Sequence, residues 1–281
     1  MDIFRKICIF AQINILEMKY SIITINYNNG KGLRNTIMSV VGQTFTDYEF
    51  IIIDGGSTDG STEVIKEFDD KIYFWVSESD KGIYNAMNKG VAHAHGDYSI
   101  FMNSGDCFYN QTVLEQVNAV NPIENIVVGK VAIDNQDNII SPPPQGELTM
   151  YHLYSGSIPH QGSFIKTELL RKCPYDESLK ISSDWKFFIQ VLILDNCSIR
   201  FLDIFVSRYD MGGLSTKNPK LMRQEKEAVM ATMFPPRVLA DYQKMKDSEC
   251  LTQTLTPLLR QHYCIDRLMH RLGTMMLKLI K

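Results

Sequence analysis

The sequence lacks any run of about 18–20 consecutive apolar residues, the length that a membrane-spanning helix needs. It also lacks an excess of basic residues, since 29 Lys and Arg residues stand against 32 Asp and Glu residues and the net charge is −3. We therefore expect neither a membrane span nor a broadly basic surface for nucleic acid. The remaining composition, 44% hydrophobic and 22% charged in 281 residues, is that of an ordinary soluble globular protein.

Several chemical signatures are missing as well. None of the six cysteines forms a CxxC pair or lies near a histidine at zinc-site spacing, so we expect reduced thiols in a cytosolic protein. There is no GxGxxG motif, no P-loop lysine–serine pair and no nucleophile elbow. His93 and His95 lie two residues apart and would point in different directions on a helix, which counts against metal chelation.

What the sequence does have is an alternation of short apolar runs and helical spacing from Tyr20 onward. Strand patterns separated by about 10–15 residues of helical pattern predict an α/β fold with a mostly parallel sheet. Ligands of such sheets bind beyond the carboxyl ends of the strands. We expect strands at 21–26, 48–53, 71–76, 98–102, 125–133, 162–166 and 198–209, and helices near 33–41 and at 61–68, 84–94 and 182–194.

The same pattern predicts three parts. Residues 1–18 would be an N-terminal extension, either an extra helix or a stretch ahead of a start at Met18. Residues 19–215 would form the main α/β domain, and residues 216–281, rich in Met, Lys and Arg, a helical C-terminal extension.

Asp54 ends a run of three isoleucines and is followed by Gly55 and Gly56, where a ligand could approach the backbone closely. A carboxylate at such a strand end can accept hydrogen bonds from a ring N–H or a ribose hydroxyl. The alternative is that Asp54, Ser57 and Asp59 cap the next helix.

Two further acidic residues also have two interpretations each. Asp106 could coordinate Mg²⁺ or Mn²⁺, with a neutral oxygen from Asn103, or it could cap a helix near Gln111. Asp184 could be a general base whose pKa is raised by the neighbouring Trp185, or an acidic residue favoured in the first turn of a helix.

In this order, the stretches "SIITINYNNGKGLRNTIMSVVGQTFTDYEFIIIDGGSTDGS" and "ESDKGIYNAMNKGVAHAHGDYSIFMNSGD" resemble the family 2 glycosyltransferases. These are inverting enzymes of GT-A fold, a Rossmann-like, mostly parallel sheet flanked by helices. The resemblance runs from Tyr20 to about Ser215 and is strongest to the subgroup that builds capsule and exopolysaccharide repeat units. "GGLS" at 212–215 resembles the family's mobile loop over the donor.

The resemblance implies a role for each candidate. Asp184 falls where the family keeps its catalytic base, and Asp106 is similar to the metal-binding carboxylate for Mg²⁺ or Mn²⁺. Asn103 and Gly105 stand where relatives often have aspartates, which weakens the metal motif. The nucleotide-sugar site would use Thr24, Asn26, Asp54, Gly55, Ser57, Asp80, Lys81, Asn85, Asn103 and His160.

The implied activity is inverting transfer of a hexose from a nucleotide-diphosphate sugar, UDP-linked by expectation, to a saccharide or lipid-linked acceptor in surface polysaccharide synthesis. The alternatives are a nucleotide-sugar-binding subunit without activity and a sugar nucleotidyltransferase.

Residues 265–281 have an apolar helical face and four basic residues. They predict a peripheral contact of residues 260–281 with the inner membrane face; packing on the main domain or in a homodimer is the alternative.

Overall fold

The computed structural model describes residues 19–133, 136–139, 146–210 and 212–261, together with positions 269, 272, 273 and 275. The chain divides into two compact units, Met1–Lys226 and Glu227–Lys281, and the division falls inside helix α10 (Pro219–Met233). The first unit therefore takes in the beginning of the predicted C-terminal extension. The prediction for residues 1–18 lies outside the described residues.

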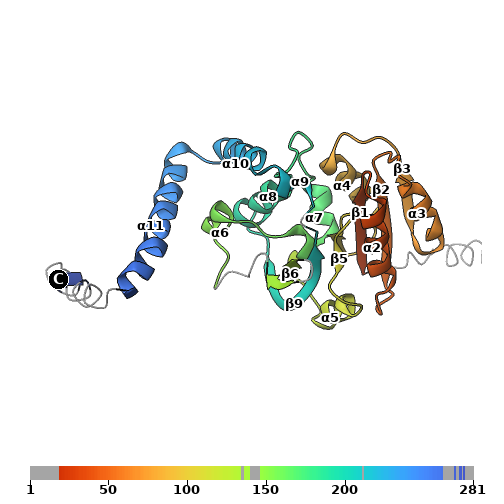
Figure 1. Cartoon of the computed structure of the whole chain (residues 1–281), viewed down its shortest axis with the longest axis horizontal. Coiled ribbons are helices and arrows are strands. Elements are labelled where there is room, and N and C mark those ends of the chain that lie inside the picture. The colour runs from red at the N-terminus through yellow and green to blue at the C-terminus, as the bar shows by residue number, and fades with distance from the viewer. Residues whose placement is uncertain are drawn as a thin grey trace, which may run out of the picture. The chain divides into compact units, whose positions relative to one another are not determined.

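The first unit is built on one nine-stranded sheet (Figure 1). Strands β3, β2, β1 and β4 are neighbours and run parallel, and β9 runs parallel to β6. The pairs β4–β8, β8–β6, β6–β7 and β9–β5 are antiparallel. The strands are β1 (Tyr20–Asn26), β2 (Tyr48–Asp54), β3 (Phe74–Ser77), β4 (Tyr98–Phe101), β5 (Cys107–Phe108), β6 (Ile126–Ile133), β7 (Gln136–Ile139), β8 (Ser163–Lys166) and β9 (Ile199–Tyr209).

Helices connect most of these strands, which confirms the predicted α/β class. They are α2 (Gly30–Val41), α3 (Ser61–Glu67), α4 (Ile83–Ala92), α5 (Val113–Ala119), α6 (Met150–Ser155), α7 (Thr167–Lys172), α8 (Ser183–Phe188) and α9 (Leu214–Lys217). Two 3₁₀ turns occur at Asp69–Lys71 and His160–Gly162, and α8 continues as a π-helical segment, Ile189–Leu194.

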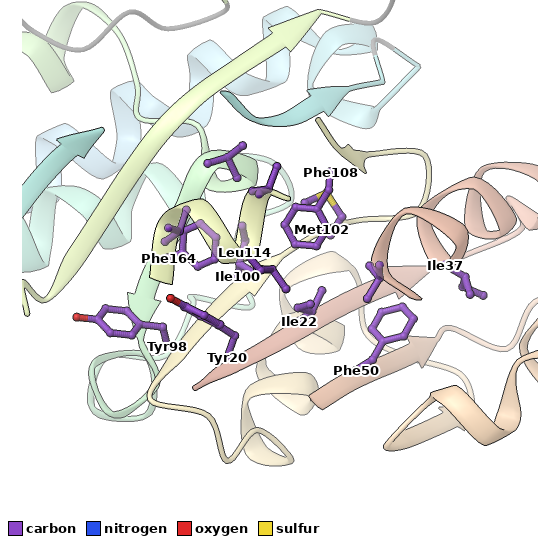
Figure 2. Packing of buried hydrophobic residues seen from close by; sticks show 14 of the residues in the cluster. Tyr20, Ile22, Ile37, Phe50, Tyr98, Ile100, Met102, Phe108, Leu114 and Phe164 are labelled. Carbon is purple, nitrogen blue, oxygen red and sulfur yellow. The ribbon is translucent and has the colours of Figure 1, made fainter. Parts of the chain in front are cut away.

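The isoleucine-rich strands β1 and β2 are buried on both faces, which is typical of continuous apolar runs in parallel sheets. Ile22 and Ile52 belong to the same buried cluster as Ile37 of α2. Figure 2 shows Ile22 and Ile37 within this cluster. The next residue of β1, Ile23, points to the opposite face because successive side chains of a strand alternate. There, a Cβ on Gly90 of α4 would overlap the Ile23 side chain, so glycine allows α4 to lie close to the sheet.

Some predicted boundaries differ from the structure. Strand β3 begins at Phe74 rather than at residue 71, because Asp69–Lys71 form a 3₁₀ turn that Trp75 reinforces by donating its indole N–H to Asp69 Oδ1 at 2.6 Å. The helix predicted at 182–194 is present, but only its first half is α-helical. Strand β5 was not predicted, since two residues carry no periodic pattern.

The second unit, as far as it is described, consists of the end of α10 and of α11 (Pro236–Gln261). No helix in the described part of the chain combines the length and the apolar character that crossing a membrane demands. Residues 265–281 lie outside the described residues except for four positions, of which Met269, Leu272 and Met275 have exposed side chains.

Candidate active site

Three polar residues form a row at the carboxyl ends of the parallel strands. Asn26 ends β1, Asp54 ends β2 and Ser77 ends β3, and the strand register places Asp54 opposite both of the others. Parallel strands that start in register bring their last side chains to one edge of the sheet. The sequence-based expectation that Asp54 lies at a strand end is therefore confirmed.

The Asp54 carboxylate is fully buried and accepts four hydrogen bonds. Oδ1 accepts from Asn26 Nδ2 at 2.7 Å and from Ser57 Oγ at 2.6 Å, and Oδ2 accepts from Ser57 N at 2.9 Å and from Ser77 Oγ at 2.6 Å. Burial acts to raise the pKa of Asp54, but the hydrogen bonds from Ser57, Ser77 and Asn26 outweigh it and the pKa is lowered. Four donors match the acceptor sites of an ionised carboxylate.

Asn26 has an acceptor to spare beside this carboxylate. Asn26 is only 4% exposed, and its Oδ1 is buried without a hydrogen-bond partner among the described residues. Next to it, a Cβ on Gly55 would lie 2.6 Å from Asp80 Oδ2 and 3.2 Å from Cδ2 of Tyr27, whose ring is exposed. The structure thus brings together Asn26, Asp54, Gly55, Ser57 and Asp80, and their assignment to a nucleotide-sugar site stays a prediction.

The turn that carries Asp106 is tied to the same strand ends. Ser104 N donates to the carbonyl of Ile25 at 3.1 Å, and Asp106 Oδ1 accepts from the backbone N–H of Asp210 at 3.0 Å. Burial raises the pKa of Asp106 to about 7; the Asp210 N–H and nearby His160 act against this rise, and the Asp210 carboxylate adds to it.

Asp210, at the end of β9, was missed by the sequence analysis. Its Oδ1 accepts from Gly212 N at 2.8 Å, and its Oδ2 lies 2.7 Å from the position that a Cβ on Gly105 would take. Gly105 has φ +109°, a left-handed conformation that disfavours aspartate. An aspartate at position 105 is therefore disfavoured, and the space beside Gly105 is filled by the carboxylate of Asp210, which follows β9.

Asp184, the second residue of α8, has both oxygens engaged. Oδ1 accepts from the Tyr84 hydroxyl at 2.8 Å, and Oδ2 lies 3.0 Å from His160 Nδ1. Burial acts to raise the pKa of Asp184, but the hydrogen bonds and charge of its partners outweigh it, and the pKa is lowered. The prediction of a raised pKa is wrong, because the hydrogen bonds and charge of His160 and the hydrogen bond of Tyr84 outweigh the effect of burial.

His160 connects the candidate base to the Asp106 turn. Its Nδ1 faces Asp184, and its Nε2 lies 3.2 Å from Nδ2 of Asn103, in the turn that carries Asp106. A neutral ring with its proton on Nδ1 satisfies both contacts. Burial acts to lower the pKa of His160, but Asp184 and Asp106 raise it overall. If His160 also carried a proton on Nε2, the Asn103 amide would have to turn. Its Oδ1, which is now buried and unpaired, would then accept from His160 Nε2–H.

Three predicted residues lie apart from these contacts. Thr24 is fully buried and donates its hydroxyl to the Met102 carbonyl at 2.6 Å. Lys81 has an exposed side chain, and its backbone N–H donates to Asn85 Oδ1 at 3.1 Å. Asn85 Nδ2 donates to Glu177 at 2.9 Å. Their assignment to the nucleotide-sugar site stays a prediction.

The alternative interpretations as helix caps can now be compared with the structure. Helix α3 begins after Gly60, which offers no side-chain cap, and the hydrogen bonds of Asp54 go to Asn26, Ser57 and Ser77. Asp59 accepts from Ser61 N, in the first turn of α3, at 3.1 Å. Helix α5 begins after Thr112, and Asp106 is turned toward β9 instead. Of the proposed capping residues, Asp59 pairs a first-turn amide, and it does so from the position before the N-cap residue Gly60.

A divalent cation would find hard oxygen donors at the Asp106 turn. The described residues contain no group of three or more His, Cys, Asp or Glu side chains arranged to hold a metal. Asp210 nevertheless donates its N–H to Asp106, its carboxylate is near enough to raise the pKa of Asp106, and the unpaired Asn103 Oδ1 lies in the same turn. Carboxylate and amide oxygens suit Mg²⁺ and Mn²⁺, so this set fits a cation shared with a ligand.

Taken with its strand-end carboxylates, the mixed α/β sheet with helices on both faces is the arrangement of the GT-A glycosyltransferases. The sequence matches the model for Glycosyl transferase family 2 over residues 21–188. The chain belongs to this family, which confirms the resemblance read from the sequence.

Curated relatives support the same assignment. The chain is 32% identical over 190 residues to the uncharacterized glycosyltransferase Rv1514c of Mycobacterium tuberculosis, covering 64% of this chain and 71% of the relative. It is 27% identical over 205 residues to a PGL/p-HBAD biosynthesis glycosyltransferase of Mycobacterium bovis, covering 70% and 78%.

Two solved structures share the fold. TarS 1–349 of S. aureus in complex with UDP superposes with a TM-score of 0.57 at 22% identity; the match covers 68% of this chain and only 60% of TarS 1–349. Glucosyl-3-phosphoglycerate synthase of Mycobacterium tuberculosis, in complex with Mn²⁺, UDP and glucosyl-3-phosphoglycerate, gives 0.54 at 18% identity, covering 77% and 82%.

Proposed function

We propose that the chain is an inverting glycosyltransferase that transfers a hexose from a UDP-linked donor to a hydroxyl of a saccharide or lipid-linked acceptor. The observation that carries this proposal is the His160 ring, whose Nδ1 lies 3.0 Å from Asp184 Oδ2 and whose Nε2 lies 3.2 Å from Asn103 Nδ2. The candidate base and the turn that carries the candidate metal carboxylate therefore belong to one connected network. A subunit that only binds nucleotide sugars would have no need for a base held at both oxygens.

Asp184 takes the central role in the proposed reaction. Its lowered pKa keeps the carboxylate ionised at neutral pH, so it can accept the proton of an acceptor hydroxyl. The oxygen of that hydroxyl forms a bond to the anomeric carbon of the donor. The bond from this carbon to the diphosphate breaks on the opposite face, and the diphosphate keeps the electron pair. Tyr84 and His160 hold the direction of the carboxylate.

Asp106 and Asp210 would hold the divalent cation. Such an ion supplies positive charge that stabilises the departing diphosphate. The Asn26–Asp54–Ser77 row would face the nucleotide: the free Asn26 Oδ1 can accept a hydrogen bond from it. Asp54 would reach a nucleobase N–H only by exchanging one of its hydroxyl donors, Ser57 or Ser77, since all four of its acceptor positions are filled.

A screen of nucleotide sugars tests this proposal. We expect UDP-sugars to raise the melting temperature more than GDP-sugars, and more in the presence of Mn²⁺, because a ligand bound only by the folded state stabilises it. Asp106→Asn should weaken Mn²⁺ binding, followed by electron paramagnetic resonance, by at least about tenfold. Asp203→Asn, on the exposed side of β9, is the matched control. Equal Mn²⁺ binding by all three proteins would remove Asp106 from the metal site.

We also propose that the protein works at the inner membrane face in surface polysaccharide synthesis, where lipid-linked acceptors are found. The support is the apolar face and basic residues of 265–281 in the sequence, together with the exposed Met269, Leu272 and Met275. An amphipathic helix with these features lies in the membrane interface.

The membrane proposal predicts that the full chain floats with liposomes rich in anionic lipid. A chain ending at residue 250 should remain at the bottom of the gradient, because it lacks the apolar and basic segment. High salt should reduce flotation, since part of the attraction is electrostatic. If the truncated chain floats as well as the full chain, the membrane role of residues 260–281 is wrong.

A further inference from the structure

Helix α10 sends one carboxylate into the segment just ahead of α8. Glu225 Oε1 accepts from the backbone N–H of Lys180 at 2.7 Å. Its Oε2 accepts from the N–H groups of Ile181 and Ser182, both at 3.0 Å. A single side chain thus pairs three consecutive amides that lie more than 40 residues earlier in the chain. We call these three hydrogen bonds the Glu225 clamp.

The amides of Ile181 and Ser182 have no ready substitute for Glu225. Lys180 and Ile181 precede α8 and Ser182 is its N-cap residue, so none of the three amides has a partner carbonyl within the helix. Ile181 is 8% exposed and Ser182 1%, so water reaches them poorly. Removing the carboxylate would leave buried donors unpaired, which a folded chain relieves by moving the segment.

The same turn of α10 also holds the residue that follows Asp184. The Lys226 ammonium lies 4.8 Å from the centre of the Trp185 ring, and the Ser182 hydroxyl donates to the Met222 carbonyl at 3.4 Å. Contacts on both sides of Asp184 therefore come from one short stretch of α10. This agrees with the boundary of the first compact unit, which ends at Lys226, directly after the clamp.

We propose that Glu225 is a positioning residue for Asp184: by pairing the amides of residues 180–182 it fixes the start of α8, and with it the direction in which the Asp184 carboxylate faces its partners. The inference rests on the proposed function, since it gives α10 a part in a reaction in which Asp184 is the base. It makes the first turns of the helical extension part of the catalytic unit.

Hydrogen exchange of the full chain tests the clamp without any substrate. In Glu225→Ala, the amides of 180–182 should exchange at least about tenfold faster than in the native protein, because their acceptor is gone. Glu227→Ala removes an exposed carboxylate from the same helix and should leave them unchanged. If Glu225→Ala does not fold, Glu225→Gln, which keeps one acceptor oxygen, should show a smaller increase. Unchanged exchange in the folded variant would overturn the proposal.

Kinetics then separates positioning from general destabilisation. With UDP release from the best UDP-sugar as the assay, Glu225→Ala should lower kcat by about 10- to 100-fold, the cost of a small misplacement of a reacting group, with the donor KM unchanged. Added to Asp184→Asn it should cause no further loss, because it acts through Asp184. A further loss, or a changed KM, would overturn the positioning role. If the native chain releases UDP from no UDP-sugar, the proposed function fails, and the exchange experiment still decides the clamp.

Discussion

Asp184→Asn should lower the rate of sugar transfer by at least about 100-fold, the lower range for the loss of a general base. The asparagine oxygen can still accept from Tyr84, and His160 can change tautomer to face the new amide, so the fold should be kept. The proton of the acceptor hydroxyl would then have no carboxylate to receive it. UDP release in the presence of acceptor measures the rate, and calorimetry with UDP should show unchanged binding.

Asp195→Asn provides the matched control for this experiment. Asp195 lies just after the π-helical continuation of α8 and is exposed, where it accepts from Gln190 at 3.0 Å. The same chemical change at the far end of the same helix should leave transfer unaffected. If Asp184→Asn retained native turnover, the base would have to be another group, and the mechanism proposed above would be wrong.

The parallel half of the sheet could be predicted because its signals are local. Each strand of β1 to β4 is a short apolar run beside a helical pattern, and strand-end residues such as Asp54 and Asp106 follow from where those runs stop. The other half depends on pairings between distant segments. The two-residue strand β5 exists only because it pairs with β9, about a hundred residues later.

The same distinction applies to the site. Asp106 and Asp184 could be singled out from their positions after a strand and at the start of a helix. Asp210 and Tyr84 could not, because each approaches its partner across 104 and 100 residues of sequence respectively. Glu225 lies in a segment whose pattern predicted only an appended helix. The sign of the Asp184 pKa shift was also mistaken from sequence, since an aromatic neighbour along the chain says nothing about which groups meet the carboxylate.

Asp54→Asn should lower the free energy of unfolding by about 2–3 kcal/mol at neutral pH, the cost of losing charge-assisted bonds and leaving a buried donor unpaired. The asparagine would have to turn its NH₂ group toward one of two donor pairs, Asn26 with the Ser57 hydroxyl or Ser77 with the Ser57 N–H. Neither pair can accept from it without a hydroxyl turning away from its present contact. Denaturant unfolding of both proteins measures the difference.

The pH dependence identifies the charge as the cause. The folded pKa of Asp54 lies below its ordinary value, so its ionisation contributes stability that is fully present above the unfolded pKa of about 3.9 and is lost as the pH falls through the folded value. The difference in the free energy of unfolding between the native protein and Asp54→Asn should thus be the same at pH 7 and pH 5, and it should become smaller below about pH 4. Asp59→Asn, at an exposed carboxylate whose pKa is also lowered by the Ser61 and Gly30 hydrogen bonds, should give a smaller difference because solvent screens it. If this difference in unfolding free energy does not change below pH 4, the packing of the Asp54 side chain, and not its charge, stabilises the fold.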